Sequence, residues 1–485
     1  METLTQIIKS LKPGEVRLIR AFYKVQSNGE IKRRLALFDY IKSGKVKNDL
    51  EAARAIYKAA PNSAYSHLKA RLQRDILNLL LLQDSSKRYD TQYTRALFDA
   101  RRMLIEGQLL IGRGAYNSGV DVLEKARSLA KKYELYNEGV AINDLLRSHL
   151  GVKAGLNTYN KYNEEIIKNL EEQHALLKAR DYYHRIIVPN LFHLNRQNQF
   201  TEYSEQVLKE LKEVFEKNKS ANIGYYYYYI GMLYAQLDNK WEDGLEYGKG
   251  FLQLVEKEES IRSNSRIAEA NLQMASMLIQ SGNPKPAIDF AIKAGKFFKK
   301  GLLNELQAIE LLFFAYYRSK DYKKTEEVIA QAESHPKYKA NKTIPARWEY
   351  YKANLYFSLG KFDEASALLI QQSELMKDRA GWLLGHKVFE LMCMIETKDT
   401  YIIDYRTESF RKLLLRQKEE NVERAKTILK ILETFAKTGL SYKKTNGLEA
   451  AKLKLLREGK GDYAWDPTGF ELIRFDEWFD SKLAK

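Results

Sequence analysis

The chain has 485 residues, of which 45% are apolar, 12% aromatic and 29% charged, and its formal net charge is +17. So much apolar content excludes a disordered chain, and the length exceeds what one hydrophobic core usually supports, so we expect several domains or an elongated repeat array. The single cysteine, Cys393, excludes an internal disulfide framework and a cysteine-based metal site.

Helix is expected nearly throughout. There are only 8 prolines, Lys, Glu, Leu and Ala dominate long stretches, and no sustained alternation of β-branched residues indicates strands. The start, METLTQIIKSLKPGE, lacks the pattern of a secretory signal. No apolar run approaches the roughly 20 residues that span a bilayer. We therefore expect a cytoplasmic protein without a membrane partner.

Short helices separated by turn signals are predicted for the first 84 residues. Apolar spacing places them at residues 15–26, 30–41, 49–59 and 64–83, with turns at SNG, SG and PNS between them. The polar segment DSSKRYD, residues 84–90, follows the last of these helices. We expect a domain boundary there, with a basic helical region over residues 1–84.

Basic residues are concentrated in this N-terminal region. Residues 1–83 hold 16 Lys and Arg against 7 Asp and Glu, which is more than half of the excess positive charge of the whole chain. Such a concentration suits a polyanionic partner, and a helix–turn–helix outline over residues 49–83 would allow contact with nucleic acid. A solvated basic face is the alternative. The cations that could bind phosphate are Arg17, Arg20, Lys24, Lys32, Arg33, Arg34, Lys69, Arg71 and Arg74.

A repeated two-helix pattern begins near residue 90. The segment RWEYYKANLYFSLGKFDEASALL places small residues, large residues and a turn glycine at Ala353, Tyr356, Gly360, Phe362 and Ala365. Related spacing recurs in units near residues 100, 225, 268 and 310, with Gly107, Gly114 and Tyr116 in the first of them. Small residues let the two helices of a hairpin approach, and glycine permits the sharp turn.

Over roughly residues 90–380 this pattern resembles the tetratricopeptide repeat, a helical hairpin with a period of about 34 residues. The resemblance implies an all-α solenoid of antiparallel helical hairpins, which we expect to cover residues 90–460. It also implies that the first helix of each hairpin lines a concave groove for a protein partner. The groove residues implied are Arg347, Tyr350, Asn354, Phe357, Tyr317, Arg318 and Tyr228.

The C-terminal residues 461–485 depart from the repeat. The turn signal DPTG precedes an amphipathic helix predicted over residues 470–483, with Phe470, Ile473, Trp478 and Phe479 as burial points. This helix is expected to cap the last hairpin, as repeat arrays require, and a docking peptide for a partner is the alternative.

Motifs that carry chemistry are absent from the sequence. None of the seven histidines forms an HExxH pair, and no phosphate-binding GxxxxGK[ST] loop, GxSxG elbow or kinase motif set occurs. We therefore expect neither an enzyme, nor a metal, nor a cofactor. The sequence predicts a scaffold or adaptor that binds a protein partner, and the alternative is a nucleic-acid-associated regulatory protein. It does not indicate an oligomeric state.

Overall fold

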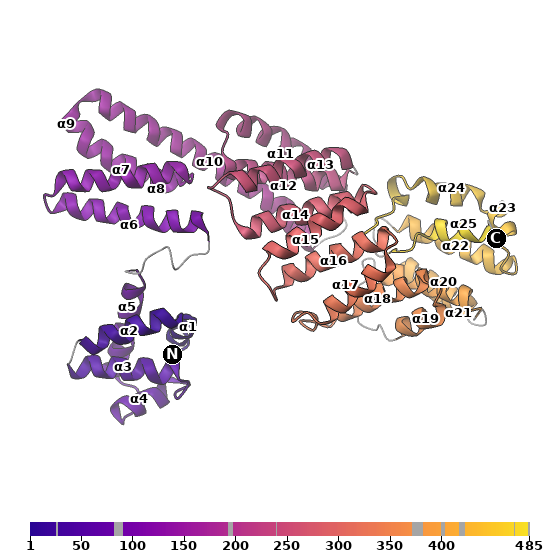
Figure 1. The fold of residues 1–485 in the computed structure, drawn as a ribbon, viewed down its shortest axis with the longest axis horizontal. Coiled ribbons are helices and arrows are strands. Elements are labelled where there is room, and N and C mark those ends of the chain that lie inside the picture. The colour runs from indigo at the N-terminus through magenta and orange to yellow at the C-terminus, as the bar shows by residue number, and fades with distance from the viewer. Residues whose placement is uncertain are drawn as a thin grey trace. The chain divides into compact units, whose positions relative to one another are not determined.

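The computed structural model describes residues 1–25, 28–81, 91–192, 197–238, 240–370, 382–398, 403–416, 422–469 and 471–483. All regular structure within these ranges is helical, which confirms the predicted all-α class (Figure 1). The chain forms two compact units, Met1–Asp90 and Thr91–Lys485. We call them the N-terminal unit and the solenoid unit.

Five short helices surround the core of the N-terminal unit. They are α1 (Glu2–Ser10), α2 (Pro13–Val25), α3 (Gly29–Lys42), α4 (Asp49–Tyr57) and α5 (Ser63–Leu81). The four predicted helices are present with ends shifted by at most two residues, and α1 was not predicted. Side chains of Asn28 and Asn48 cap α3 and α4, as expected for helices that follow a polar turn. Ile8 of α1 is fully buried in the core.

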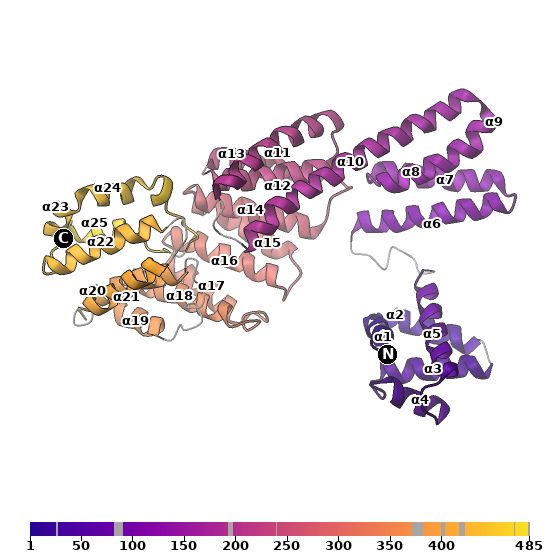
Figure 2. The ribbon, with the colours of Figure 1, turned by 180° about the vertical axis from the view of Figure 1, so that it is seen from behind.

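Helices follow one another as antiparallel neighbours along the solenoid unit (Figures 1 and 2). In chain order they are α6 (Gln92–Gly112), α7 (Tyr116–Lys132), α8 (Tyr136–Leu146), a π-helical turn (Arg147–Gly151), α9 (Val152–Ala154), α10 (Leu156–Phe192), α11 (Gln197–Asn218), α12 (Ala221–Leu237), α13 (Trp241–Lys257), α14 (Asn264–Gln280), α15 (Pro284–Phe297), α16 (Leu303–Arg318), α17 (Tyr322–Glu333), α18 (Thr343–Ser358), α19 (Phe362–Ile370), α20 (Trp382–Thr397), α21 (Ile403–Arg416), α22 (Glu423–Lys437), α23 (Tyr442–Leu448), α24 (Ala450–Glu458), a 3₁₀ turn (Gly461–Tyr463) and α25 (Phe475–Leu483).

The predicted small residues and turn glycines have the roles that the repeat pattern assigns them. A Cβ atom on Gly107 of α6 would lie 2.6 Å from Cγ of Leu123 in α7, so the two helices could not pack this closely with a larger residue there. Gly360, between α18 and α19, has φ 76°, a backbone conformation that glycine adopts at little cost. The array is therefore a tetratricopeptide-like solenoid.

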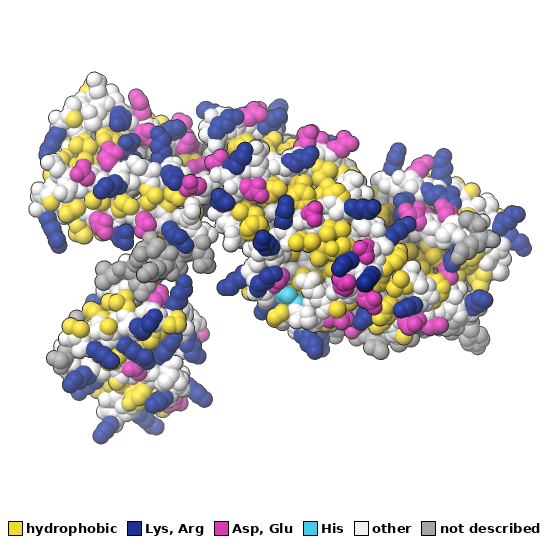
Figure 3. Space-filling model, in the orientation of Figure 1, with side chains coloured by type: hydrophobic (Ala, Val, Ile, Leu, Met, Phe, Trp, Pro, Cys, Tyr) yellow, Lys and Arg dark blue, Asp and Glu magenta, His cyan; other side chains and the backbone are white. Residues whose placement is uncertain are grey.

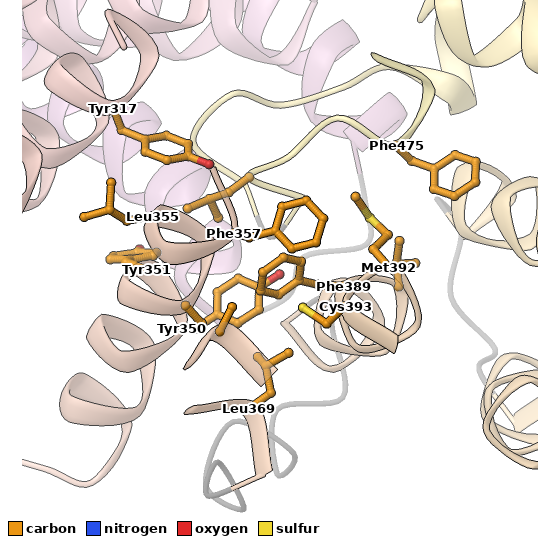
Figure 4. Close-up of a cluster of buried hydrophobic side chains, with 14 of the residues drawn as sticks. Tyr317, Tyr350, Tyr351, Leu355, Phe357, Leu369, Phe389, Met392, Cys393 and Phe475 are labelled. Carbon is orange, nitrogen blue, oxygen red and sulfur yellow. The ribbon is translucent and has the colours of Figure 1, made fainter. Parts of the chain in front are cut away.

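One hydrophobic core runs through the second half of the solenoid unit, from Ala275 in α14 to Phe479 in α25. Figure 4 shows part of it, where Phe389 of α20 lies against Tyr350 and Phe357 of α18. The ring centroids are 5.7 and 5.3 Å apart. Successive hairpins are thus joined by interlocking aromatic side chains, as the stacking of helical repeats requires.

The prediction of a helix over residues 470–483 is wrong in its first part. Helix α25 begins at Phe475, and residues 471–474 are not helical; Phe470 lies outside the described residues. The main-chain oxygen of Glu471 accepts a hydrogen bond from Trp465, and its side chain accepts one from the backbone N–H of Phe475. These bonds keep the segment irregular up to the start of α25. Trp478 and Phe479 are buried as predicted, and Ile473 is half-buried.

Candidate partner-binding groove

The chain's own C-terminal segment crosses several first helices of the hairpins. We call residues 464–469 and 471–474 the C-terminal strap, and the side of the helices that meets it the groove face. Gln280 of α14 donates to Thr468 of the strap over 3.5 Å. Residues 269, 273, 276 and 280 recur every three to four positions, so they share one face of α14. The groove face of α14 therefore extends from Gln280 back to Glu269.

Most of the predicted groove residues are covered rather than open. Tyr350 and Asn354 are each only 1% exposed. Tyr317 and Phe357 are also buried. The ring of Tyr317 stacks on Phe313, and Phe357 packs on Phe389. These four side chains therefore cannot line an open groove, because neighbouring hairpins and the strap occupy the space that the prediction left to a partner.

Arg318, at the end of α16, holds the strap through main-chain atoms. Its guanidinium donates to the oxygen of Pro467 from Nε at 2.9 Å and from Nη2 at 2.5 Å, and to the oxygen of Leu472 from Nη1 at 2.6 Å. It also lies 4.6 Å from the ring centroid of Trp465. Burial lowers the pKa of Arg318. A forked cation that binds carbonyl oxygens recognises backbone shape rather than a particular side chain.

Arg424 of α22 fixes the other end of the strap. Its guanidinium bonds to both carboxylate oxygens of Glu471, at 2.6 and 2.8 Å, and to Asp476 at 2.8 Å. Burial acts to lower the pKa of Arg424, but these charged hydrogen bonds outweigh burial and raise it. The ion pairs are nearly closed to solvent, with side-chain exposures of 9%, 9% and 2% for Arg424, Glu471 and Asp476.

The strap fits closely against α18 and α20. Leu472 is 1% exposed, and the contact leaves a cavity of only about 10 Å³, roughly the smallest space that holds one water molecule. Asn354 lines this cavity. Its Nδ2 donates to the main-chain oxygen of Tyr350 at 2.8 Å, whereas its Oδ1 is buried without a hydrogen-bond partner. The cavity beside this acceptor is large enough for one water molecule, which could donate the missing hydrogen bond.

Beyond Gln280 the groove face is not covered by the strap. Tyr225 of α12 donates to Glu269 of α14 at 2.9 Å, and the guanidinium carbon of Arg266 lies 4.7 Å from the Tyr225 ring centroid. Gln273 donates to the hydroxyl of Tyr229 over 3.5 Å. Burial raises the pKa of Glu269, and hydrogen bonds from the two tyrosines and the charge of Arg266 only partly oppose it. Tyr229 is buried, with its ring centroid 5.2 Å from that of Tyr183 of α10, whereas the other four side chains are half-buried. We call these five residues the open groove cluster, because the strap does not cover them.

The last two predicted groove residues have other surroundings. Tyr228 faces α11 and α13 rather than α14: its ring is 5.7 Å from that of Phe215, and it lies over Gly250. The prediction that Tyr228 lines the groove is therefore wrong. Tyr225 and Tyr229 are the tyrosines of α12 that contact α14. Arg347 of α18 lies 3.1 Å from Glu310 of α16, with 31% of its side chain exposed.

The predicted phosphate-binding cations fall into two groups. Five are engaged within the N-terminal unit: Arg20 pairs with Asp39, Arg34 with Asp75 and Glu30, Lys69 with Asp49 and Arg71 with Glu30, and Arg33 lies 5.1 Å from the ring centroid of Tyr57. The others, Arg17, Lys24, Lys32 and Arg74, are exposed and make no ion pair among the described residues. Figure 3 shows that Lys and Arg outnumber Asp and Glu on the visible face of this unit.

Sequence reasoning missed Arg424, Glu471 and Glu269. Arg424 and Glu471 are 47 residues apart, and nothing in either segment signals that they meet. In the parts of the chain that the structure describes, no three His, Cys, Asp or Glu side chains are grouped so that they could hold a metal ion. The same parts contain no helix that is both long and apolar enough to span a membrane.

No family model matches the sequence, and no curated protein matches it. Several solved structures are similar, including the following two. The apo form of RapI is 13% identical, with 79% of this chain and 96% of that chain covered and a TM-score of 0.45. A signal transduction ATPase with numerous domains from Pyrococcus horikoshii, which carries a tetratricopeptide repeat sensor, is 16% identical, with 83% of this chain and 63% of that chain covered and a TM-score of 0.40.

Proposed function

We propose that the chain is a non-enzymatic scaffold or adaptor that binds a segment of a protein partner in the open groove cluster on α12 and α14. Solenoids of helical hairpins expose long continuous surfaces and commonly act through them. The strap covers the groove face from Gln280 onward, which leaves the half-buried side chains of Tyr225, Arg266, Glu269 and Gln273 for a partner to contact.

The observation that carries this proposal is the way in which the strap is held. Arg318 binds two main-chain oxygens of an irregular segment, and Trp465 of the strap lies on its guanidinium. The groove face therefore has the chemistry to hold an extended segment by its backbone. A partner segment bound further along the same face is expected to be extended too.

The composition of the open groove cluster supports a peptide that carries both polar and aromatic groups. Tyr225 contributes an aromatic ring that stacks with Tyr229 and contacts Arg266, Arg266 contributes a cation, and Glu269 and Gln273 contribute hydrogen-bonding groups. All four side chains are half-buried. Aromatic residues and arginine dominate binding energy at protein interfaces because they add large contact area to directed polar contacts.

The test is affinity capture from the native cell with the full chain, with and without nuclease. Two matched variants each remove one positive charge. Arg266→Ala changes the cluster, and Arg262→Ala is the control, because Arg262 is an exposed residue just before α14. We expect a stoichiometric protein that survives nuclease, persists with Arg262→Ala and is lost with Arg266→Ala. Equal capture by both variants would contradict the proposed site.

The second candidate function is binding of nucleic acid through the N-terminal unit. It is favoured by the four exposed cations, Arg17, Lys24, Lys32 and Arg74, which have no acidic partner among the described residues. Cations whose charge is not neutralised within the protein can displace counterions from phosphates. This candidate and the groove proposal concern different units and are tested separately.

A further inference from the structure

Helix α10 buries one face and leaves the other exposed along most of its 37 residues. Tyr162, Leu176 and Ala179 on one side are buried against neighbouring helices. On the other side the side chains of Leu156, Ile167, Leu170, Leu177 and Val188 are 70%, 50%, 52%, 49% and 46% exposed. Figure 2 shows α10 in view over most of its length. A row of exposed aliphatic side chains on a single helix indicates an interaction surface.

The positions along this face of α10 follow a heptad spacing, and all of them except the half-buried Asn163 are exposed. Steps of four and three residues connect Leu156, Asn160, Asn163, Ile167, Leu170, His174, Leu177, Asp181, His184 and Val188. We call these ten residues the α10 seam. Apolar residues that recur every 3.5 positions on average form the contact line of a coiled coil, because they stay on one side of a slightly supercoiled helix. The shape that fits the α10 seam is therefore another helix.

Polar side chains in the α10 seam limit the strength of such a contact. Three of them already have contacts within the chain. Asn163 accepts from Arg147 at 2.6 Å, Asp181 pairs with Arg185 at 2.7 Å, and a ring nitrogen of His184 lies 2.7 Å from the main-chain oxygen of Arg180. Polar residues at seam positions make a coiled coil weaker but more specific in its alignment. We therefore expect a reversible pairing of helices that is centred on Ile167, Leu170 and Leu177.

Charges beside the seam decide the occupant and its direction. One edge of the seam is formed by the residues that directly follow seam positions 163, 170, 177 and 184. These residues are Glu164, Glu171, Lys178 and Arg185, and all four are exposed. The edge is thus acidic in the first half of the helix and basic in the second. A second copy of α10 in the antiparallel direction places Glu171 opposite Lys178 and Glu164 opposite Arg185, twice each by symmetry.

A parallel pair lacks this match. In a parallel pair, each edge residue would face the opposite edge of the seam on the second copy. Arg185 of one copy would then face Arg180 of the other, which is a repulsive contact. Lys178 and Arg185 also pair with Glu210 and Asp181 within the chain, but their side chains remain 46% and 65% exposed. We propose that two copies of this chain associate antiparallel through the α10 seam.

The first test is the mass of the full chain by sedimentation equilibrium over a range of concentrations. We expect reversible association from the monomer mass of 56.5 kDa to twice that mass. Leu170→Glu with Leu177→Glu should abolish the dimer, whereas Ile292→Glu, at a 50% exposed site on α15, should leave it intact. A monomer at the highest soluble concentration, or equal effects of the two variants, would overturn the proposal.

A charge exchange tests the antiparallel direction while keeping the apolar seam. One variant carries Glu164→Lys and Glu171→Lys, and the other carries Lys178→Glu and Arg185→Glu. Each variant alone should be monomeric, because like charges then face each other, and an equimolar mixture should form a heterodimer. Circular dichroism establishes that both variants are folded. Folded variants that dimerise alone, or that fail to pair when mixed, would contradict the antiparallel arrangement.

Discussion

The guanidinium of Arg318 and the main-chain oxygen of Pro467 are joined by two hydrogen bonds, at 2.9 and 2.5 Å, across 149 residues of sequence. This contact places the C-terminal strap on the groove face of the solenoid. The part of the groove that the repeat pattern marks most clearly is consequently filled by the chain itself, and the part that the strap leaves uncovered lies on α12 and α14.

Replacing Arg318 should loosen the strap. Arg318→Gln cannot reproduce the fork that binds two carbonyl oxygens, and the loss of charged hydrogen bonds is worth about 2 kcal/mol. Backbone amides of residues 465–469 and 471–474 should then exchange with deuterium roughly tenfold faster or more, while those of α6 and α7 are unchanged. Lys323→Ala, at an exposed site on α17, is the control. Unaltered exchange in the strap of Arg318→Gln would show that other contacts hold it.

Breaking the buried ion pair of Arg424 should strongly destabilise the solenoid unit. Arg424→Met leaves the buried carboxylate of Glu471 without a cation and Asp476 with Arg474 alone, and breaking a buried pair in this way typically costs about 3–5 kcal/mol. Arg457→Met breaks an exposed pair with Asp480, whose side chains are 38% and 40% exposed, and should cost less than about 1 kcal/mol. Urea unfolding followed by circular dichroism measures both changes. Similar costs for the two variants would contradict the burial argument.

The pH dependence of stability should reflect Glu269. Because burial raises the pKa of Glu269 in the folded protein, the unfolded chain loses this proton more readily as the pH rises. The protonated side chain of Glu269 therefore stabilises the folded protein at a pH below the ordinary glutamate pKa. This contribution is lost as the pH rises through the raised pKa of the folded state. Glu269→Gln should melt at a higher temperature than the wild type at pH 7, with the difference shrinking toward pH 4.

The matched control for this experiment is Glu256→Gln, an exposed residue of α13, for which we expect no such trend. Thermal denaturation of both variants at several pH values supplies the comparison. If Glu269→Gln were less stable than the wild type at pH 7, the carboxylate would be stabilising its surroundings in the charged form.

Nucleic-acid binding, if it occurs, should depend on the cations without acidic partners. Lys24→Glu with Arg74→Glu should weaken binding of the full chain to DNA or RNA and flatten its dependence on salt by about two units of slope. Arg20→Glu with Arg71→Glu changes the same charge at residues already engaged with Asp39 and Glu30 and should have a smaller effect. Failure of the wild-type chain to bind at low salt, measured by fluorescence anisotropy, would remove this candidate.

The hairpin array could be predicted from the sequence because its determinants are local. Gly107, Gly360 and Ala353 are close in sequence to the helices they allow to pack. The groove could not be predicted in the same way, since its occupancy depends on Arg318 and Arg424 meeting residues 149 and 47 positions later. Helix α1 was missed because its pattern is short, and its burial depends on contacts with α3.

The register of the tyrosine run shows the same limit at a smaller scale. Five consecutive tyrosines must point around the whole helix, so sequence alone cannot decide which of them meet α14. The structure selects Tyr225 and Tyr229, through Glu269 and Gln273.

Hydrogen exchange of the full chain, alone and bound to the protein captured from its native cell, tests the central claim most directly. If a partner segment occupies the open groove cluster, backbone amides of α12 and α14 should exchange more slowly, and exchange in the N-terminal unit should be unchanged. Arg266→Ala should abolish this protection and Arg262→Ala should not. Protection confined to other helices, with none on α12 and α14, would contradict the account.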